Sequence, residues 1–394
     1  MMGLRTQFVH LWVCDQTEKS NDTFEDYGLF TQVEQLNKTA LKAHGLDKSG
    51  HLYKVNSFDF HRYEDTIKLA DDPDYNQANF DGMLEIKGDT DHTKLIEMLD
   101  ALNDESQKID DVLDIYFDTE NLVYWLAFQI LTGNCDTQNR NCYLYSPLNS
   151  KVWYILDWDN DGMLRKLELS LTGFSDYASW ERGASNYWGN VLFNRALRSK
   201  SFRSELDRAV KDLRSYLTET RLTKMIKHYR EVTESLVFAS PDIDHLPVTK
   251  DQYEQITAAI PSEIEENYKS FRESYKKPMP FYIGVPQIDN GKLRINWDAS
   301  YDFEARDIRY TVELARDYAI KDVLFKADDV LLPEVTCDAP DTGQYFVRVR
   351  ATNSDGYKQD AFDYYATDDG KHYGMKCFYV QDGGKVVEDT YEEG

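Results

Sequence analysis

Two groups of polar residues flank a predicted β-hairpin near the middle of the sequence. Asp136 and Asn141 lie in the polar run before the hairpin, and Asp157, Asp159 and Asp161 follow it. Hard divalent cations prefer oxygen ligands such as these, and a carboxylate left beside a cation can accept a proton. Folding the hairpin back brings its two ends together. We therefore expect a cation site with one carboxylate available for base chemistry.

The elements that must position these residues can be read from the flanking sequence. The largely apolar run 122–132 has helical length and ends at Gly133-Asn134, a helix-stop signal. Two short strand-like runs follow, 142–145 and 152–156, joined by a Pro-Leu-Asn-Ser turn. The sequence thus predicts a helix, a polar loop and a hairpin in succession.

Protein kinases arrange similar residues in a similar order. A catalytic-loop Asp is followed five residues later by a metal-binding Asn, and a metal-binding Asp lies beyond a hairpin. Asp136 and Asn141 have this spacing. The His-Arg that would precede the Asp and the Asp-Phe-Gly that would follow the hairpin are both absent. An ordinary protein kinase is therefore not indicated.

The central stretch resembles the spore-coat CotH kinase family, a group of atypical kinases. The resemblance rests on the run G-N-x-D-x4-N-x-Y-x-Y, followed by a strand and by D-x-D-N. Upstream segments that resemble the family's early strands and its "YGLY…E" and "LYK" segments are 8–12, 27–35 and 50–54. The resemblance covers about residues 5–270 and implies a two-lobed α+β domain with a β-rich small lobe and a helical large lobe.

The resemblance implies phosphoryl transfer from ATP to a Ser, Thr or Tyr hydroxyl of a protein. Asp136 would accept or orient the hydroxyl proton, and Asn141, Asp157 and Asp159 would hold Mg²⁺ or Mn²⁺. An alignment with one gap would move the aspartate pair to Asp159 and Asp161. The register of the metal ligands therefore stays open.

A kinase-like small lobe also needs a strand Lys that grips the nucleotide and a helix Glu that holds it. Lys54, in the predicted strand 52–55, and Glu34, at the start of a predicted helix ended by Gly45, are the candidates. The alternative is that both are ordinary surface charges. No glycine-rich phosphate loop is visible.

The same acidic stretch fits a calcium loop. Asp157, Asp159, Asp161, Gly162 and Glu168 satisfy the EF-hand pattern, so Ca²⁺ is a possible ligand. An EF-hand needs a helix before its first Asp, however, and here a Pro-containing turn and a Val-Trp-Tyr-Ile strand precede it. We favour a carboxylate loop that binds Mg²⁺ or Mn²⁺ with the nucleotide.

Composition excludes several classes of protein. The 394-residue chain has a formal net charge of −25, which argues against nucleic acid because phosphate backbones are bound by stripes of Lys and Arg. No apolar run reaches the roughly 18 to 20 residues of a spanning helix. The five cysteines are scattered, without disulfide or zinc spacing. A strand pattern begins almost at once, so we expect natural N-terminal residues to be missing.

The sequence changes character near Lys276, from helical to strand-and-turn. The alternating runs 292–297, 308–315 and 345–351 predict a β-sandwich, and their residues resemble a fibronectin type III domain at about 281–369. We therefore expect a CotH-kinase-like domain over 1–277 and a fibronectin-like sandwich with a tail over 278–394. Such modules favour a secreted, cell-surface or spore-coat location.

Three classes of function follow from these observations. The first is an atypical protein kinase that uses ATP and a divalent cation. The second is a non-catalytic binding or scaffold protein of the cell surface or spore coat, with a degenerate kinase fold. The third is a calcium-stabilised surface protein. Protein substrates or coat proteins are the expected partners.

Overall fold

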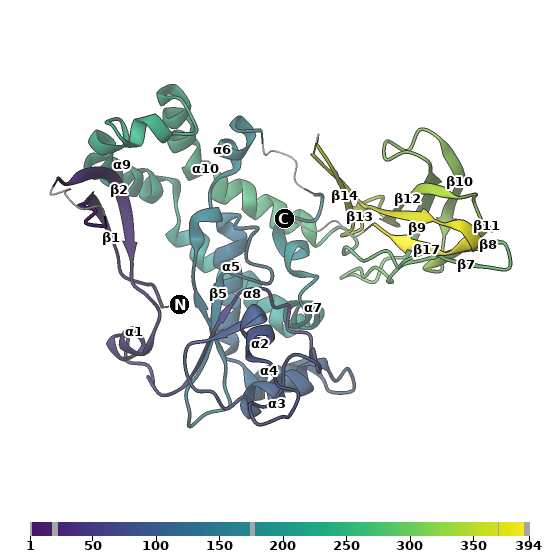
Figure 1. Cartoon of the computed structure of the whole chain (residues 1–394), viewed down its shortest axis with the longest axis horizontal. Helices are drawn as coiled ribbons and strands as arrows, with labels where there is room; N and C mark the ends of the chain where they lie inside the picture. Colours follow the sequence, from purple (N-terminus) through teal and green to yellow (C-terminus); the bar gives the residue numbers. More distant parts are fainter. Residues whose placement is uncertain (1, 18–22, 174–177, 369, 390–394) are drawn as a thin grey trace. The chain divides into compact units, whose positions relative to one another are not determined.

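The structure, a computed structural model, describes residues 2–17, 23–173, 178–368 and 370–389. The fold is α+β, as predicted, and the chain forms two compact units, residues 1–175 with 190–267 and residues 176–189 with 268–394. Figure 1 traces the elements of each. The division passes through helix α10 (Lys250–Ser274), whereas the sequence placed a boundary after residue 277.

A four-stranded antiparallel sheet lies in the first unit. Its strands are, in spatial order, β4 (Leu84–Ile86), β3 (His51–Val55), β5 (Cys142–Ser146) and β6 (Tyr154–Asp157). The predicted hairpin is thus confirmed as β5 and β6. Side chains of one face form a buried cluster with the short helix α1 (Lys38–Ala43), and its members are Leu36, Ala40, Leu41, Leu52, Tyr143, Tyr145 and Leu156.

Helix α5 (Thr119–Thr132) is the central helix of this unit. Asp118 caps its first turn by accepting a hydrogen bond from Asn121 N, and Gly133 ends it in a left-handed conformation. The predicted helix stop is therefore confirmed. Further helices of this unit are α2 (Gln77–Met83), α3 (Thr93–Asn103), α4 (Ile109–Tyr116), α6 (Lys166–Leu171), α7 (Val191–Arg198), α8 (Lys200–Tyr216) and α9 (Glu219–Val237).

One local prediction is wrong in its bounds. The helix expected from Glu34 begins only at Lys38, because the side chain of Asn37 accepts hydrogen bonds from Thr39 N and Ala40 N and caps it there. The acidic stretch 104–114 contains most of α4, which buries Val112 and Leu113. Its acids lie on the exposed side of an amphipathic helix.

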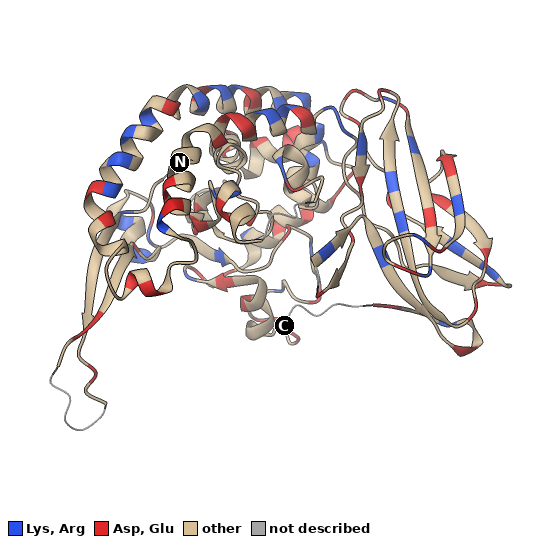
Figure 2. Cartoon of the chain, turned by 90° about the horizontal axis from the view of Figure 1, so that it is seen from above, with Lys and Arg blue, Asp and Glu red and all other residues tan. Residues whose placement is uncertain are grey.

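A separate two-stranded ribbon consists of β1 (Thr6–Val13) and β2 (Glu25–Val33). Within the described part of the chain neither strand pairs with any further strand. The ribbon lies beside α9 in Figure 1, where the rings of Phe8 and Tyr229 are 6.0 Å apart. Figure 2 shows the ribbon from a second side, and β1 carries no charged Lys, Arg, Asp or Glu side chain.

The second unit is rich in strands and contains a β-sandwich. One sheet has the order β10-β9-β12-β16-β17, with β13 also paired to β12, and a three-stranded sheet has the order β11-β8-β7. The two sheets share a core that includes Trp297, Val312 and Val347. Its strands are β7 (Gln287–Asp289), β8 (Lys292–Asn296), β9 (Ile308–Ala315), β10 (Val323–Val330), β11 (Glu334–Asp338), β12 (Gly343–Asn353), β13 (Lys358–Asp360), β14 (Tyr364–Thr367), β15 (Gly370–Tyr373), β16 (Met375–Val380) and β17 (Val386–Glu388).

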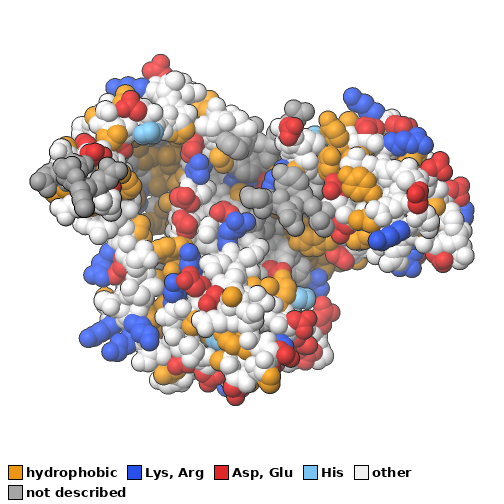
Figure 3. Space-filling view, viewed as in Figure 1, with side chains coloured by type: hydrophobic (Ala, Val, Ile, Leu, Met, Phe, Trp, Pro, Cys, Tyr) orange, Lys and Arg blue, Asp and Glu red, His pale blue; other side chains and the backbone are white. Residues whose placement is uncertain are grey.

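The three strands predicted by alternation are confirmed as β8, β9 and β12. Assignment of the sandwich to the fibronectin type III class stays a prediction. The tail contributes more than expected, because β16 and β17 extend the larger sheet beside β12. None of the helices in the described ranges is long and apolar enough to cross a membrane. On the face seen in Figure 3, acidic, basic and hydrophobic side chains are interspersed.

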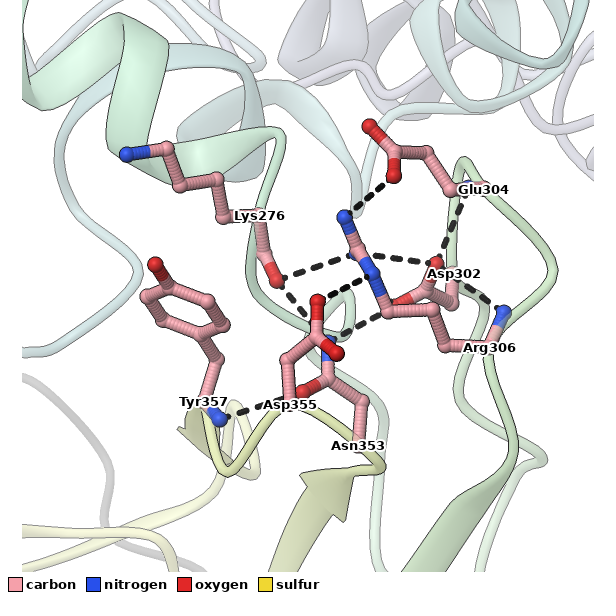
Figure 4. A network of polar contacts seen from close by, with 7 residues as sticks. All are labelled: Lys276, Asp302, Glu304, Arg306, Asn353, Asp355 and Tyr357. Atoms are coloured by element: carbon pink, nitrogen blue, oxygen red, sulfur yellow. Dashed lines mark hydrogen bonds and ion pairs between the residues drawn. The ribbon is translucent and has the colours of Figure 1, made fainter.

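A polar network fixes the start of the sandwich to the segment after α10 (Figure 4). Arg306 pairs with three carboxylates, those of Asp302, Glu304 and Asp355. Asn353 Nδ2 donates to Asp302 Oδ2 at 2.9 Å and to the carbonyl oxygen of Lys276 at 2.8 Å. Burial opposes ionisation of Asp302, but the hydrogen bonds from Asn353 and Arg306 outweigh it and hold its pKa below the usual range.

We predict that Arg306→Met destabilises the second unit by on the order of 2–3 kcal/mol, because it leaves the buried Asp302 carboxylate without its cation. Denaturant unfolding of the whole chain, followed by tryptophan fluorescence, measures this. Arg316→Met is the matched control, since its ion pair with Asp322 is exposed and worth at most about 1 kcal/mol. Equal effects of the two variants would contradict the prediction.

A buried histidine packs beneath the sheet of the first unit. His92 is stacked on Phe80 with ring centroids 4.2 Å apart, and its Nδ1 lies 2.9 Å from the Tyr53 hydroxyl. Burial lowers the pKa of His92 below its usual value. The imidazole of His92 therefore binds a proton less readily in the folded protein than in the unfolded chain.

We predict that stability falls as the pH drops below about 6.5, by up to about 1.4 kcal/mol per pH unit for a histidine that stays neutral. His92→Gln keeps the hydrogen bonding but cannot titrate in this range, so melting temperatures measured between pH 7 and pH 5 should fall less steeply. The exposed His228→Gln is the control and should leave the slope unchanged. A wild-type slope in His92→Gln would refute the assignment.

Candidate active site

The open end of the β5–β6 hairpin brings the two predicted groups of polar residues together. In the antiparallel register Cys142 lies opposite Asp157, so the loop before β5 and the loop after β6 start from the same place. The two loops then approach closely at Gly162. A Cβ atom built on Gly162 would lie 2.7 Å from Asn134 Oδ1 and 3.7 Å from Asp136 Cβ. A larger residue at position 162 would require the buried Asn134 side chain to shift.

Asp136 is the exposed carboxylate of the site. Its side chain is 52% exposed, and Arg140 Nε lies 3.4 Å from its Oδ1. Asn141 Nδ2 donates to Asp136 Oδ2 at 2.8 Å. Asn141 itself has a positive φ of 58°, a conformation that Asn tolerates better than most residues. The spacing of five residues therefore places the carboxylate and the carboxamide side by side.

Asp157 is the more enclosed carboxylate. Gln129 Nε2 and Asn160 Nδ2 donate to it at 2.7 and 2.5 Å. Burial raises the pKa of Asp157, and the hydrogen bonds from Asn160, Gln129 and Trp125 only partly offset this. Because burial removes water from the Asp157 carboxylate, a bound cation would stabilise its ionised form.

Asp159 lies where the chain turns out of β6, with a positive φ of 56°. Partial burial raises the pKa of Asp159, as does repulsion from Asp161 and Asp136, while Lys54 lowers it. These four charged groups are thus close enough to influence one another. The groups that act on the pKa of Asp159 come from β3, from the loop after α5 and from the loop after β6.

Lys54 lies on β3, with Tyr143 of β5 and Glu85 of β4 as its strand neighbours. Its Nζ is 6.0 Å from the centroid of the Trp158 ring. Lys54 forms no ion pair within the parts of the chain that the structure describes. Its amine is therefore available to an anionic ligand such as a phosphate.

Glu34 has partners other than Lys54. It forms an ion pair with Arg5, and its Oε2 lies 2.8 Å from His44 Nε2. Hydrogen bonds from Arg5 and His44 lower the pKa of Glu34 to about 2. The Lys54–Glu34 pair expected from the sequence is thus not formed in this structure.

Three residues that line the site were not predicted to have a role in it. Gln129 is fully buried, and its Oε1 has no hydrogen-bond partner within the described chain. It is a lone amide in the apolar run 122–132, which is a signal that sequence reading could have used. Asn160, the last residue of the D-x-D-N motif, holds Asp157 in place. Trp158 adds an aromatic face beside Lys54.

The donor chemistry of the site fits a hard divalent cation. All candidate ligands are carboxylate or amide oxygens, and the unpartnered Gln129 Oε1 adds one more. Across the described residues, however, no group of three or more His, Cys, Asp or Glu side chains is arranged to hold a metal. Burial raises the pKa values of both Asp157 and Asp159, so a bound cation would stabilise their ionised forms.

The EF-hand alternative does not fit the local fold. The residues before Asp157 form strand β6 rather than an entering helix. Glu168, which would supply the last calcium ligand, pairs instead with Arg165 at 2.7 Å. A 3₁₀ turn (Asn160–Gly162) and helix α6 follow the acidic residues. The loop is therefore not an EF-hand.

Comparisons with known proteins bear on the whole first unit. A family model described as "CotH kinase protein" matches residues 1–271. No curated protein matches the chain. One similar solved structure is the twitchin kinase region from C. elegans, at 16% identity and a TM-score of 0.19 over 24% of this chain and 20% of that chain. Such a short and weak structural likeness carries no argument about the site. The family model spans well over half of the sequence, and the chain therefore belongs to the CotH kinase family.

Proposed function

We propose that this protein transfers the γ-phosphoryl group of ATP to a hydroxyl of a protein substrate, with a divalent cation. The observation that carries the proposal is the open end of the hairpin, where Asn141 donates to Asp136 and the loop after β6 approaches Asp136 at Gly162. Lys54 lies beside Trp158 of the same loop. Phosphoryl transfer depends mainly on positioning and charge stabilisation, and this cluster offers groups of both signs at one place. Membership of the CotH kinase family supports a kinase-like activity.

In the proposed reaction, Asp136 accepts the proton of the substrate hydroxyl as its oxygen attacks the γ-phosphorus. The bond between that phosphorus and the β–γ bridging oxygen breaks, and ADP leaves with the bridging oxygen. Asn141 orients Asp136 through their 2.8 Å hydrogen bond. The exposure of Asp136 supports this role, because a protein side chain must reach it from solvent.

Lys54 is proposed to bind a phosphate oxygen, since its amine has no ion-pair partner in the described chain and its charge lowers the pKa of Asp159. Asn141, Asp157 and Asp159 would hold Mg²⁺ or Mn²⁺, with Asp161 as the ligand in the alternative register. When bound, the cation neutralises the phosphates. Gln129 and Asn160 fix the Asp157 carboxylate through its two oxygens.

A non-catalytic scaffold with a kinase-like fold is the second candidate. It is favoured by the engagement of Glu34 with Arg5 and His44, which leaves Lys54 without a supporting acid. For either function we propose surface or coat proteins as partners and a secreted, cell-surface or spore-coat location, as family membership suggests.

The first test is the melting temperature with ATP plus Mg²⁺ or Mn²⁺, compared with ATP alone, each metal alone and Ca²⁺ alone. A ligand at a hundred times its Kd adds about 2.7 kcal/mol of stability, so we expect a clear rise that requires both ATP and metal. Asp159→Asn should abolish the rise, because it removes an exposed charge of the cluster without removing packing. Stabilisation by Ca²⁺ alone, or none at all, would contradict a nucleotide site.

A second prediction concerns chemistry rather than binding. Asp136→Asn should slow transfer of labelled phosphate from ATP to protein by about 10²–10⁴-fold, as expected for loss of a general base. The melting shift with ATP and metal should remain. Arg140→Gln is the matched control, because it removes the ion-pair partner but keeps the carboxylate. Full transfer activity in Asp136→Asn would exclude the assigned role.

A further inference from the structure

The last two carbonyl groups of helix α5 accept hydrogen bonds from distant parts of the chain. Carbonyl groups at the end of a helix have no partner within it. Asn267 Nδ2 of α10 donates to Leu131 O at 3.0 Å, and Leu164 N, in the loop after β6, donates to Thr132 O at 2.8 Å. Leu164 has a positive φ of 55°, which a leucine adopts only where the surrounding structure imposes it. The end of α5 is therefore bonded both to α10 and to the loop that follows the hairpin.

The start of α6 is held by the same helix, α10. Glu263 of α10 is only 4% exposed, and its two carboxylate oxygens accept from Lys166 N at 3.3 Å and from Leu167 N at 3.4 Å. The first N–H groups of a helix have no partner within it, and a carboxylate beside them also interacts favourably with the helix dipole. Glu263 therefore fixes the point at which the loop after β6 ends and α6 begins.

The two buried polar residues of α10 thus hold both loops of the candidate site. Glu263 and Asn267 are four residues apart, which places them on the same side of the helix. Asn267 bonds the end of α5, from which the loop that carries Asp136 starts. Glu263 bonds the far end of the loop that carries Asp159 and Asp161. A single helix therefore fixes the spacing between the two loops.

Burial of these two side chains needs a reason, because a buried carboxylate or amide costs free energy unless its hydrogen bonds compensate. Glu263 and Asn267 are 4% and 5% exposed. Apolar residues at the two positions could pack α10, but they would leave backbone groups of α5 and α6 without these partners. Their hydrogen bonds therefore act on the segments that border the site.

We propose that Glu263 and Asn267 are positioning residues, which set the spacing of the two loops and thereby the affinity of the site for a divalent cation with ATP. They act through the backbone of α5 and α6, and neither is assigned a contact with the cation or the nucleotide. The inference rests on the proposed function, because it concerns the same site.

The proposal is tested on the full chain by measuring the melting temperature against the Mn²⁺ concentration at a fixed concentration of ATP. Glu263→Gln keeps the size of the side chain but replaces one acceptor oxygen with a donor, and Asn267→Leu removes the donor to α5. Each variant should need about tenfold more Mn²⁺ for half of the melting-temperature rise, as is typical when groups that support metal ligands are lost. If Asn267→Leu does not fold, Glu263→Gln decides.

Glu266→Gln is the matched control on the same helix. Glu266 pairs with the side chain of Lys166, rather than with its backbone, and is 44% exposed. Exposed ion pairs of this kind contribute little. The control should therefore need the same Mn²⁺ concentration as the wild type, and a tenfold increase there would contradict the assignment to Glu263.

The electron paramagnetic resonance spectrum of the bound Mn²⁺ gives a readout that a purely structural role would not move. The lines should broaden in Glu263→Gln and Asn267→Leu, because the ligands then adopt more than one arrangement. Wild-type spectra and a wild-type Mn²⁺ requirement in both variants would overturn the positioning role, even if the unliganded variants melt at lower temperatures. Absence of any rise with Mn²⁺ and ATP in the wild type would instead contradict the proposed function itself.

Discussion

The antiparallel pairing of Cys142 with Asp157 is the constraint on which the candidate site depends. Successive residues of a strand face opposite sides of a sheet, so this register sends Asp157 toward Gln129 of α5 and Trp158 toward Lys54. A slip by one residue would exchange the two faces and bury the indole where the carboxylate belongs. The hairpin therefore sets which acid is enclosed and which side chains stay accessible.

Like charges are held together in the site at a cost in stability. Burial raises the pKa of Asp157, and burial together with repulsion from Asp161 and Asp136 raises that of Asp159, so the folded chain would be more stable with fewer ionised carboxylates there. The missing side chain of Gly162 lets the two loops meet, and amide donors rather than cations hold Asp157. Perturbed groups of this kind are common where a protein binds ligands or performs chemistry.

Much of this arrangement could be predicted from sequence, because it depends on local patterns. Alternation located β5 and β6, Gly133 marked the end of α5, and the D-x4-N spacing put Asp136 beside Asn141. The partners of Glu34 could not be predicted, since Arg5 and His44 reach it from positions 29 and 10 residues away. The start of α1 at Lys38 was not predicted, because the cap at Asn37 rather than the apolar pattern determines where the helix begins.

The second unit is discontinuous in sequence, since residues 176–189 belong to it along with 268–394. In its described part, Trp180 packs on Phe362 and Trp188 stacks on Tyr301. The polypeptide therefore passes from one unit to the other three times, at 175/176, 189/190 and 267/268. The strand-rich unit is therefore not a module appended after the family domain, because one of its segments comes from within the residues that the family model matches.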